Sequence, residues 1–221
     1  MELMEAMRQR HSVRQYEARP IAEDVAAALQ QEIDACNREG GLHIQLVRNE
    51  PKAFDSFMAH YGKFSGVTDY IALVGPKSGK LDELCGYYGE RLVLRAQQLG
   101  LNSCWVAMTY KKIPGAFKVA SGEKLTVVIA LGYGKTCGEA HTSKSASAVS
   151  NVGADSPQWF KDGVEAALLA PTAMNQQKFR LDYADGAVTA KSGSGCYTKV
   201  DLGIVKYHFE LAAGKESFRW R

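Results

Sequence analysis

The pattern of hydrophobic and polar positions predicts a chain in which helices and strands are mixed. Apolar residues recur at helical spacing in five segments, residues 2–9, 20–39, 81–99, 159–169 and 200–213, so we expect helices there. Apolar runs or alternations of strand length occupy residues 42–47, 70–74, 103–107, 125–131, 179–183 and 188–190, with a turn as the alternative for residues 103–107. Residues 133–155 are rich in Gly, Ser, Thr and Lys, which predicts a long surface connection.

The order of these segments favours an α+β fold, because helices and strands do not alternate as strictly as in a parallel βαβ sheet. A length of 221 residues allows one large domain or two small lobes. A faint internal repeat points to two lobes: residues 24–46 resemble residues 163–181, and residues 85–100 resemble residues 196–214. The identities are low, so a chance match between ordinary helix–strand units explains the repeat equally well.

Composition excludes several classes of function. Hydrophobic residues make up 46% of the chain and the formal net charge is +3, which is ordinary for a globular protein and too weakly basic for a nucleic-acid surface. No apolar run has the length of a signal peptide or a membrane span, so we expect a cytoplasmic protein without membrane contact. The five cysteines are scattered without a CxxC pair, which favours reduced thiols over disulfides or a zinc site. Neither the cysteines nor the five histidines show metal-ligand spacing, and a catalytic cysteine is the less favoured alternative.

Two stretches resemble nucleotide-binding loops without meeting their pattern. Residues 75–80 read GPKSGK, which is one residue short of a Walker A loop and is followed by Leu81 in place of Ser or Thr. Residues 134–136 read GKT, but the opening glycine of the loop would fall at Ile129. No GxGxxG follows a predicted strand, so neither a P-loop nor a Rossmann site is expected.

The basic segment, residues 10–14, combines two arginines with a hydroxyl group. Arg10, His11, Ser12 and Arg14 follow the first predicted helix. Guanidinium groups offer forked donors that match phosphate oxygens, and serine adds a further donor. These residues predict a phosphate-binding site; a solvated basic turn is the plainer alternative and, from the spacing alone, the commoner one.

The polar turn, residues 171–177, lies between a predicted helix and a predicted strand. Its amides at Asn175 and Gln177 each present a donor and an acceptor, so they could bind a heterocycle that carries carbonyls and ring nitrogens. A helix end closed by turn-forming residues is the plainer alternative. Residues 100–106 resemble a helix end followed by a tight entry into the sheet, and residues 129–135 end a buried strand with two glycines, where a ligand could approach the backbone or where the chain simply turns.

Together, these elements resemble the nitroreductase family of FMN enzymes. The family's R-x-S-x-R-x-[YF] element is matched by Arg10, Ser12, Arg14 and Tyr16. Its A-P-[ST]-x-x-N-x-Q-P-W element is matched by Ala170, Pro171, Thr172, Asn175 and Gln177, with Lys178 and Phe179 in place of Pro and Trp. Its G-L-x-[ST]-C-W element is matched by Gly100, Leu101, Ser103, Cys104 and Trp105, and its strand ending in [IL]-G-Y by Leu131, Gly132 and Tyr133.

One departure places the chain in a particular branch of the family. In most members the A-P-[ST] element follows soon after the arginine element, whereas here residues 35–41 lack it and it occurs near residue 170. The order resembles a branch, typified by a nitroreductase of a thermophilic bacterium, in which two family units are fused. The resemblance implies an α/β/α sandwich with antiparallel and mixed sheets, and a monomer that acts as an intrachain pseudo-dimer. Residues 1–150 would form a lobe with the phosphate site, and residues 151–221 a degenerate lobe that completes a single FMN site.

The resemblance also implies roles for individual residues. Arg10 and Ser12, beside His11, would bind the FMN phosphate, and Arg14 would reach the pyrimidine edge of the flavin. Lys144 would be a second phosphate cation, with Lys135 as a weaker candidate. The remaining cofactor contacts would come from the polar turn and from the backbone near the flavin N5 atom, that is from Pro171, Thr172, Ala173 and Asn175, with Gln177 as support, and from Trp105, Val106 and Ala107. No catalytic side chain is expected, since the flavin carries the chemistry.

The function implied by the resemblance is an FMN-dependent oxidoreductase that takes hydride from NAD(P)H and reduces a small acceptor by ping-pong transfer. The sequence does not tell whether the acceptor is a nitroaromatic, a quinone, a free flavin or another physiological compound, and no motif distinguishes NADH from NADPH. A non-catalytic flavin or nucleotide carrier or sensor is an alternative, because Lys178 and Phe179 depart from the motif. An unrelated α+β enzyme that binds a phosphorylated ligand through the basic segment is a third hypothesis.

Overall fold

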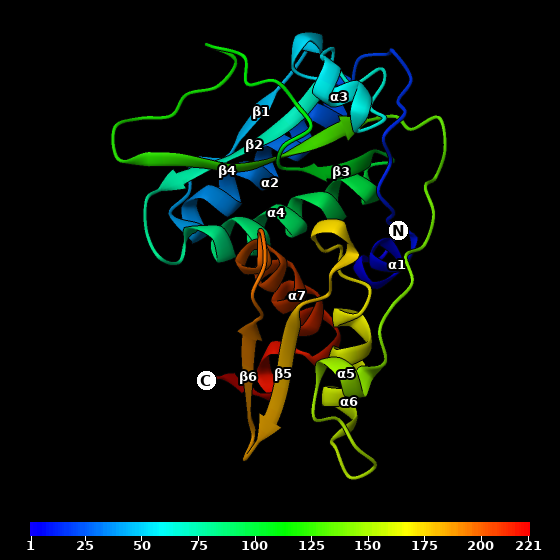
Figure 1. Cartoon of the computed structure of the whole chain (residues 1–221), viewed down its shortest axis with the longest axis vertical. Coiled ribbons are helices and arrows are strands. Elements are labelled where there is room, and N and C mark those ends of the chain that lie inside the picture. Colours follow the sequence, from blue (N-terminus) through cyan, green and yellow to red (C-terminus); the bar gives the residue numbers. More distant parts are fainter. The chain divides into compact units, whose positions relative to one another are not determined.

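The computed structural model describes residues 1–221 and divides them into two compact units (Figure 1). The C-terminal unit comprises Met1–Arg8, Asp82–Arg91 and His141–Arg221, and the central unit comprises Gln9–Leu81 and Leu92–Ala140. These units are defined by contacts within the chain and not by family units. The lobe boundary expected at residue 150 therefore stays a prediction.

The central unit is built on a four-stranded antiparallel sheet in the order β1-β2-β4-β3. The strands are β1 (Gln45–Val47), β2 (Asp69–Pro76), β3 (Asn102–Val106) and β4 (Glu123–Gly132). Its helices are α2 (Glu23–Gly40), the one-turn η1 (Pro51–Ala53), α3 (Phe57–Tyr61) and the part of α4 (Leu81–Gln98) that begins at Leu92. The helix α2 buries one stripe of residues and is capped by Gly41, which adopts a left-handed conformation common at helix C-termini.

The two central strands, β2 and β4, are buried on both faces. Tyr70, Ala72 and Ala130 face a cluster that includes the aromatic side chains of Phe54 and Phe64. Phe54 makes edge contacts with Phe64 and Tyr70, with ring centroids 5.2 and 5.8 Å apart. The alternate residues of both strands, among them Ile71, Leu73, Ile129 and Leu131, are buried as well. Continuous apolar runs rather than alternation follow from this two-sided burial.

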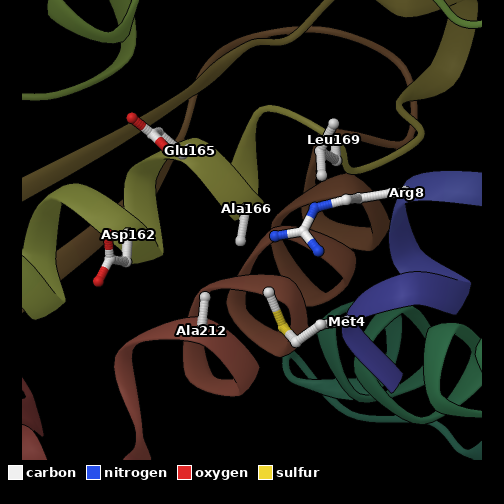
Figure 2. Close-up of a pocket in the computed structure, with 7 residues that line it drawn as sticks. All are labelled: Met4, Arg8, Asp162, Glu165, Ala166, Leu169 and Ala212. Atoms are coloured by element: carbon white, nitrogen blue, oxygen red, sulfur yellow. The ribbon is translucent and has the colours of Figure 1, made fainter. Parts of the chain in front are cut away.

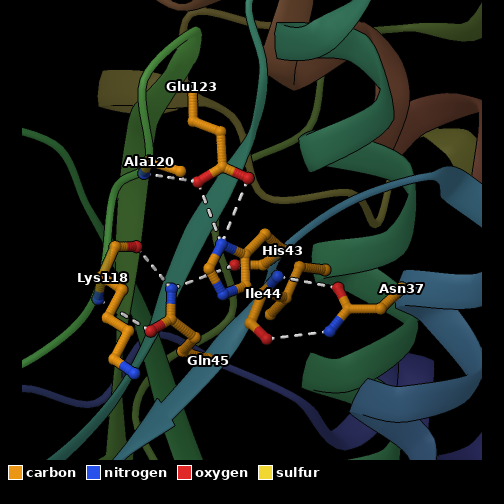
Figure 3. A network of polar contacts seen from close by, with 7 residues as sticks. All are labelled: Asn37, His43, Ile44, Gln45, Lys118, Ala120 and Glu123. Atoms are coloured by element: carbon orange, nitrogen blue, oxygen red, sulfur yellow. Dashed lines mark hydrogen bonds and ion pairs between the residues drawn. The ribbon is translucent and has the colours of Figure 1, made fainter.

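A network of polar side chains connects the end of α2 to the edge strand β1 (Figure 3). The Asn37 amide donates to the carbonyl oxygen of Ile44 (2.9 Å) and accepts from the Ile44 N–H (2.7 Å). Gln45 exchanges two hydrogen bonds with the Lys118 backbone, at 2.7 and 2.8 Å. The strand β1 begins only at Gln45, so the longer strand predicted over residues 42–47 was wrong at its start.

The C-terminal unit packs helices against a small mixed sheet of order β5-β6-β7. The strands are β5 (Phe179–Ala184), β6 (Ala187–Ser192) and β7 (Arg219–Trp220), with β5 antiparallel and β7 parallel to β6. The helices are α1 (Leu3–Gln9), α5 (Ala146–Val149), α6 (Gln158–Ala167) and α7 (Thr198–Ala213), with the one-turn helices η2 (Ala173–Asn175) and η3 (Lys215–Ser217). The first half of α4 belongs to this unit and crosses α7 where both helices carry a glycine, Gly86 and Gly203.

Most of the predicted elements are confirmed, including the α+β class with antiparallel and mixed sheets. The long connection over residues 133–155 contains the short helix α5, and the helix expected from Pro20 begins at Glu23. Sequence reasoning did not identify α3 or β7, which have five and two residues. No helix combines the length and the apolar character that crossing a membrane requires.

Candidate functional site

The basic segment lies in the central unit, where its backbone is fixed on both sides. Ser12 forms a parallel bridge with Ser103 of β3, and the Val13 N–H donates to the Ser103 carbonyl at 3.0 Å. Beyond β4, the Lys135 N–H donates to the Gln15 carbonyl at 2.9 Å. Isolated bridges therefore hold the segment against the sheet, and it is not the solvated turn of the plainer hypothesis.

Tyr16 anchors the end of this segment in the core. Its hydroxyl donates to the carbonyl of Val13 at 2.7 Å, and burial raises its pKa well above the ordinary value, so the hydroxyl stays protonated. The Tyr16 N–H donates to the Ser65 carbonyl (2.9 Å) and the Ser65 N–H donates to the Arg14 carbonyl (3.0 Å). Gly66 follows with a φ of +72°, and a Cβ at that position would lie 2.2 Å from the Tyr16 carbonyl oxygen. Only glycine fits this crossing.

Three residues of the basic segment lie close enough to the Cys104 thiol to influence its pKa. Burial raises the pKa of Cys104, while Arg14, a hydrogen bond with Ser12, and Arg10 oppose that rise. Arg10, Ser12 and Arg14 thus lie near Cys104, the middle residue of β3. Because burial prevails, Cys104 remains a thiol and does not qualify as a nucleophile.

The residues after Cys104 differ in what they can offer a ligand. Val106 is buried in the same cluster as Cys104, so its side chain is part of the core. Trp105 is half-buried, and Ala107 follows the last residue of β3. Val106 can therefore offer a ligand only its backbone, whereas Ala107 is half-buried; the predicted backbone contacts with a flavin stay a prediction. The backbone of Gly138 packs closely against His11: a Cβ at position 138 would lie 2.8 Å from the His11 Cβ.

The polar turn lies in the C-terminal unit and is held by its own amides. The Gln177 side chain donates to the carbonyl of Thr142 (2.9 Å) and to the Asn175 side-chain oxygen (2.8 Å), and it accepts from the Lys144 N–H (2.8 Å). The Asn175 amide donates to the same Thr142 carbonyl at 2.9 Å. Gln177 is 4% exposed and Asn175 is exposed. Gln177 is therefore a supporting residue, while Asn175 stays accessible to a ligand.

The side chain of Lys144 donates hydrogen bonds to the backbone of the polar turn. Its Nζ donates to the carbonyls of Gln176 (2.9 Å) and Gln177 (3.0 Å). An ammonium group carries three N–H donors, so one remains for a further acceptor such as a phosphate oxygen. The backbone N–H of Lys135, the weaker candidate, is used by Gln15, and its side chain is exposed.

Asp201, in the first turn of α7, was not identified from the sequence. One carboxylate oxygen accepts from the Ala173 N–H (2.9 Å) and the other from the Gln176 amide (2.7 Å). An acidic residue near a helix N-terminus is ordinary, so nothing in the local pattern distinguishes it. Of the predicted turn residues, Thr172 closes the turn through its side chain, which accepts from the Gln177 N–H at 3.0 Å, and Pro171 has no N–H to donate.

A cavity of about 470 Å³ opens elsewhere in the C-terminal unit (Figure 2). Arg8 extends toward Asp162 and Glu165 of α6, above an apolar floor that includes Met4 and Ala212. None of its lining residues belongs to the basic segment or the polar turn. The predicted cofactor residues therefore do not use this cavity.

The comparisons with known proteins identify the family. The family described as "Putative TM nitroreductase" matches residues 2–213. The chain belongs to this nitroreductase family. The resemblance found in the sequence motifs is thereby confirmed, and the chain is assigned to a family of oxidoreductases.

Solved structures of nitroreductases share the fold. A putative nitroreductase from Thermotoga maritima has a TM-score of 0.68 and 23% identity, over 96% of this chain and 83% of that chain. One from Desulfovibrio desulfuricans, in complex with FMN, has a TM-score of 0.54 and 14% identity, over 71% of this chain and 98% of that chain. A Parabacteroides distasonis protein, described as a putative NADH dehydrogenase/NAD(P)H nitroreductase, has a TM-score of 0.50 and 19% identity, over 70% and 98%. No curated protein matches the sequence.

The donor chemistry of the two clusters fits FMN. Two guanidinium groups and a hydroxyl on one fixed strand suit a phosphate ester. The polar turn has an accessible amide on a backbone that its neighbours hold in place, which suits a ligand with carbonyl and N–H groups. The structure thus gathers the predicted residues into two clusters, one in each unit.

Proposed function

We propose that this nitroreductase-family protein is an FMN-dependent oxidoreductase that takes hydride from NAD(P)H and reduces a small organic acceptor. The observation that carries the proposal is the basic segment, whose Arg10, Ser12 and Arg14 lie near Cys104 in the middle of β3, on a backbone that is hydrogen-bonded to Ser103 and Ser65. The FMN complex and the NAD(P)H nitroreductase among the structural neighbours support the choice of cofactor and reductant.

In this proposal each residue has a limited task. Arg10 and Ser12 bind the phosphate of FMN, and Arg14 places a positive charge at the pyrimidine edge, where it favours negative charge on the ring. Lys144 adds a phosphate contact through its remaining N–H. Asn175 and the backbone of the polar turn orient the cofactor, with Gln177 behind them, and the backbone at Val106 and Ala107 contributes next to Trp105.

Bound FMN supplies hydride acceptance from the nicotinamide and electron delivery to the acceptor. The protein contributes binding, orientation and charge, and water serves as the proton source because no side chain is assigned as a general acid. We propose one FMN per chain and a chain that functions as a monomer. Nitroaromatics and quinones are the acceptor classes to test first.

The absorbance spectrum of the purified protein tests this proposal. Flavin bands near roughly 370 and 450 nm should bleach when NADH or NADPH is added without oxygen, and should return when a quinone or nitroaromatic follows. Protein that is colourless and cannot be loaded with FMN would contradict the proposal. Yellow protein that neither nicotinamide bleaches would instead support the carrier or sensor hypothesis.

A further inference from the structure

Asp201 connects α7 to two positions of the polar turn. It is 3% exposed, and its two oxygens accept from the Ala173 N–H at 2.9 Å and from the Gln176 Nε2 at 2.7 Å. The same Gln176 nitrogen also donates to the Cys196 carbonyl at 2.9 Å. The carboxylate therefore accepts a hydrogen bond from each partner and donates none.

The polar turn needs such external support because its backbone is strained. Met174, Asn175 and Gln177 have φ angles of 52°, 51° and 45°, in the left-handed region. This region costs a residue other than glycine about 1–2 kcal/mol, and it persists only where the surroundings impose it. Two groups of contacts impose it here, the bonds to residues 142–144 and the bonds to Asp201.

We propose that Asp201 is a positioning residue that holds the polar turn in its ligand-binding conformation when ionised and releases part of it when protonated. The inference rests on the proposed function of the turn as an FMN ligand. It goes beyond that proposal because it makes the turn, and with it cofactor retention, dependent on pH.

The hydrogen-bond inventory explains the release. A protonated carboxyl group has one oxygen that must donate, yet both partners of Asp201 are N–H donors. The Ala173 N–H belongs to the backbone and cannot be reversed. Gln176 can present its oxygen only by turning its amide over, and that movement breaks its bond to the Cys196 carbonyl. Protonation therefore costs the turn at least one bond.

The change falls in an accessible pH range. Burial raises the pKa of Asp201 to about 6, and the hydrogen bonds from Ala173 and Gln176 offset this only in part. No charged side chain is among the causes; of its ionisable sequence neighbours, Cys196 and Lys199 are exposed and Tyr197 is half-buried. Because the folded-state pKa is raised, the folded protein binds the proton more tightly than the unfolded chain. Protonation of this group therefore does not itself lower global stability as the pH falls below 6.

Three proteins test the proposal: the wild type, Asp201→Asn and Asp201→Ala. Asparagine keeps an acceptor for Ala173 and cannot titrate, whereas alanine removes both bonds. The dissociation constant for FMN is measured from pH 8 to pH 5. The FMN phosphate itself titrates near a pKa of about 6, so the readout is the ratio of wild-type to Asp201→Asn affinity at each pH. We expect the ratio of wild-type to Asp201→Asn affinity for FMN to fall by about 5-fold or more when the pH drops from 8 to below 6. At pH 8, we expect Asp201→Ala to bind FMN about 10-fold more weakly than the wild type.

A matched control is Asp182→Asn, which changes a carboxylate of β5 that pairs with Arg180 at 2.8 Å. It should keep the wild-type pH profile. A ratio of wild-type to Asp201→Asn affinity that does not change with pH, or wild-type affinity in Asp201→Ala, would overturn the proposal.

A measurement on the protein without FMN separates this inference from the proposed function. The amide resonance of Ala173, followed by NMR, should titrate with a midpoint near pH 6 in the wild type and should not titrate in Asp201→Asn. If this titration is present but FMN does not bind at any pH, the proposed function fails and the pH-dependent turn stands. If the Ala173 amide is insensitive to pH, the inference itself is wrong.

Discussion

Glu90 of α4 and His208 of α7 form a fully buried pair, with the His208 Nε2 2.9 Å from the Glu90 Oε1. The other ring nitrogen of His208 lies 3.1 Å from the carbonyl oxygen of Ala166 on α6. A carbonyl oxygen can only accept, so that nitrogen carries a hydrogen. His208 therefore joins three helices of the C-terminal unit through polar contacts in an apolar interior.

We expect His208→Ala to lower the free energy of unfolding by about 3–5 kcal/mol, because it leaves the carboxylate of Glu90 buried without this partner. The double variant Glu90→Met, His208→Leu removes both polar groups and should recover at least about 1 kcal/mol of that loss. Urea unfolding followed by circular dichroism measures both values. Equal losses in the single and double variants would show that the pair contributes only by packing.

The crossing of α4 and α7 should not tolerate a single added methyl group. A Cβ at Gly86 would lie 2.0 Å from the Val200 carbonyl oxygen, and a Cβ at Gly203 would lie 2.0 Å from the Glu83 carbonyl oxygen. Both obstacles are backbone atoms, so the helices must separate. We expect Gly86→Ala to cost about 1–3 kcal/mol or more.

Gly153→Ala is the matched control for this crossing, since a Cβ at Gly153 meets nothing within 4 Å and its φ is not left-handed. It should be neutral or stabilising by up to about 1 kcal/mol, because alanine restricts the unfolded chain. Thermal unfolding of the two variants side by side gives the comparison. An unchanged melting temperature for Gly86→Ala would mean that α4 and α7 do not cross as closely as described.

Much of the fold could be predicted because burial leaves a periodic trace in the sequence. The helix α2 shows its stripe at Ala26, Leu29 and Ile33, and β4 shows a continuous apolar run because both of its faces are covered. The helix α3 has five residues and β7 has two, which is too short for either period to be expressed.

The candidate site was predictable only where its residues are consecutive. Arg10, Ser12 and Arg14 form a local motif, and so does the polar turn. Asp201 lies 28 positions from Ala173 and 25 from Gln176, and only the fold brings these groups together. A contact between a side chain and a distant backbone N–H leaves no spacing to recognise, so this residue could not be found from the sequence.

The pair of His43 and Glu123 should make stability depend on pH (Figure 3). The hydrogen bond from His43, at 2.9 Å, and that from the Ala120 N–H lower the pKa of Glu123 below its usual value. A lowered folded-state pKa stabilises the fold above the unfolded pKa, and this contribution is lost as the pH falls through the folded-state value. We expect Glu123→Gln to reduce stability at neutral pH and to match the wild type once the pH is well below the folded-state pKa of Glu123. Urea midpoints at both pH values decide this, and a deficit of equal size at both would contradict it.

The basic segment can be tested by comparing two flavins that differ only in the phosphate group. If Arg10 binds the phosphate, Arg10→Ala should weaken FMN binding by about 10-fold or more and leave riboflavin binding unchanged. Arg14 is assigned to the pyrimidine edge, which both flavins share, so Arg14→Ala should weaken the binding of both. The double variant should lose about 3 kcal/mol of FMN affinity.

Quenching of flavin fluorescence gives the dissociation constants. Arg38→Ala, an exposed arginine in the last turn of α2, is the control and should bind both flavins normally. Because Arg10 is 4% exposed, its variant is first checked for wild-type circular dichroism, and the exposed Arg14 provides an independent test that does not depend on the interior. If Arg10→Ala weakens FMN and riboflavin equally, the phosphate lies elsewhere. If neither Arg10→Ala nor Arg14→Ala changes the affinity for either flavin, the basic segment is not the cofactor site.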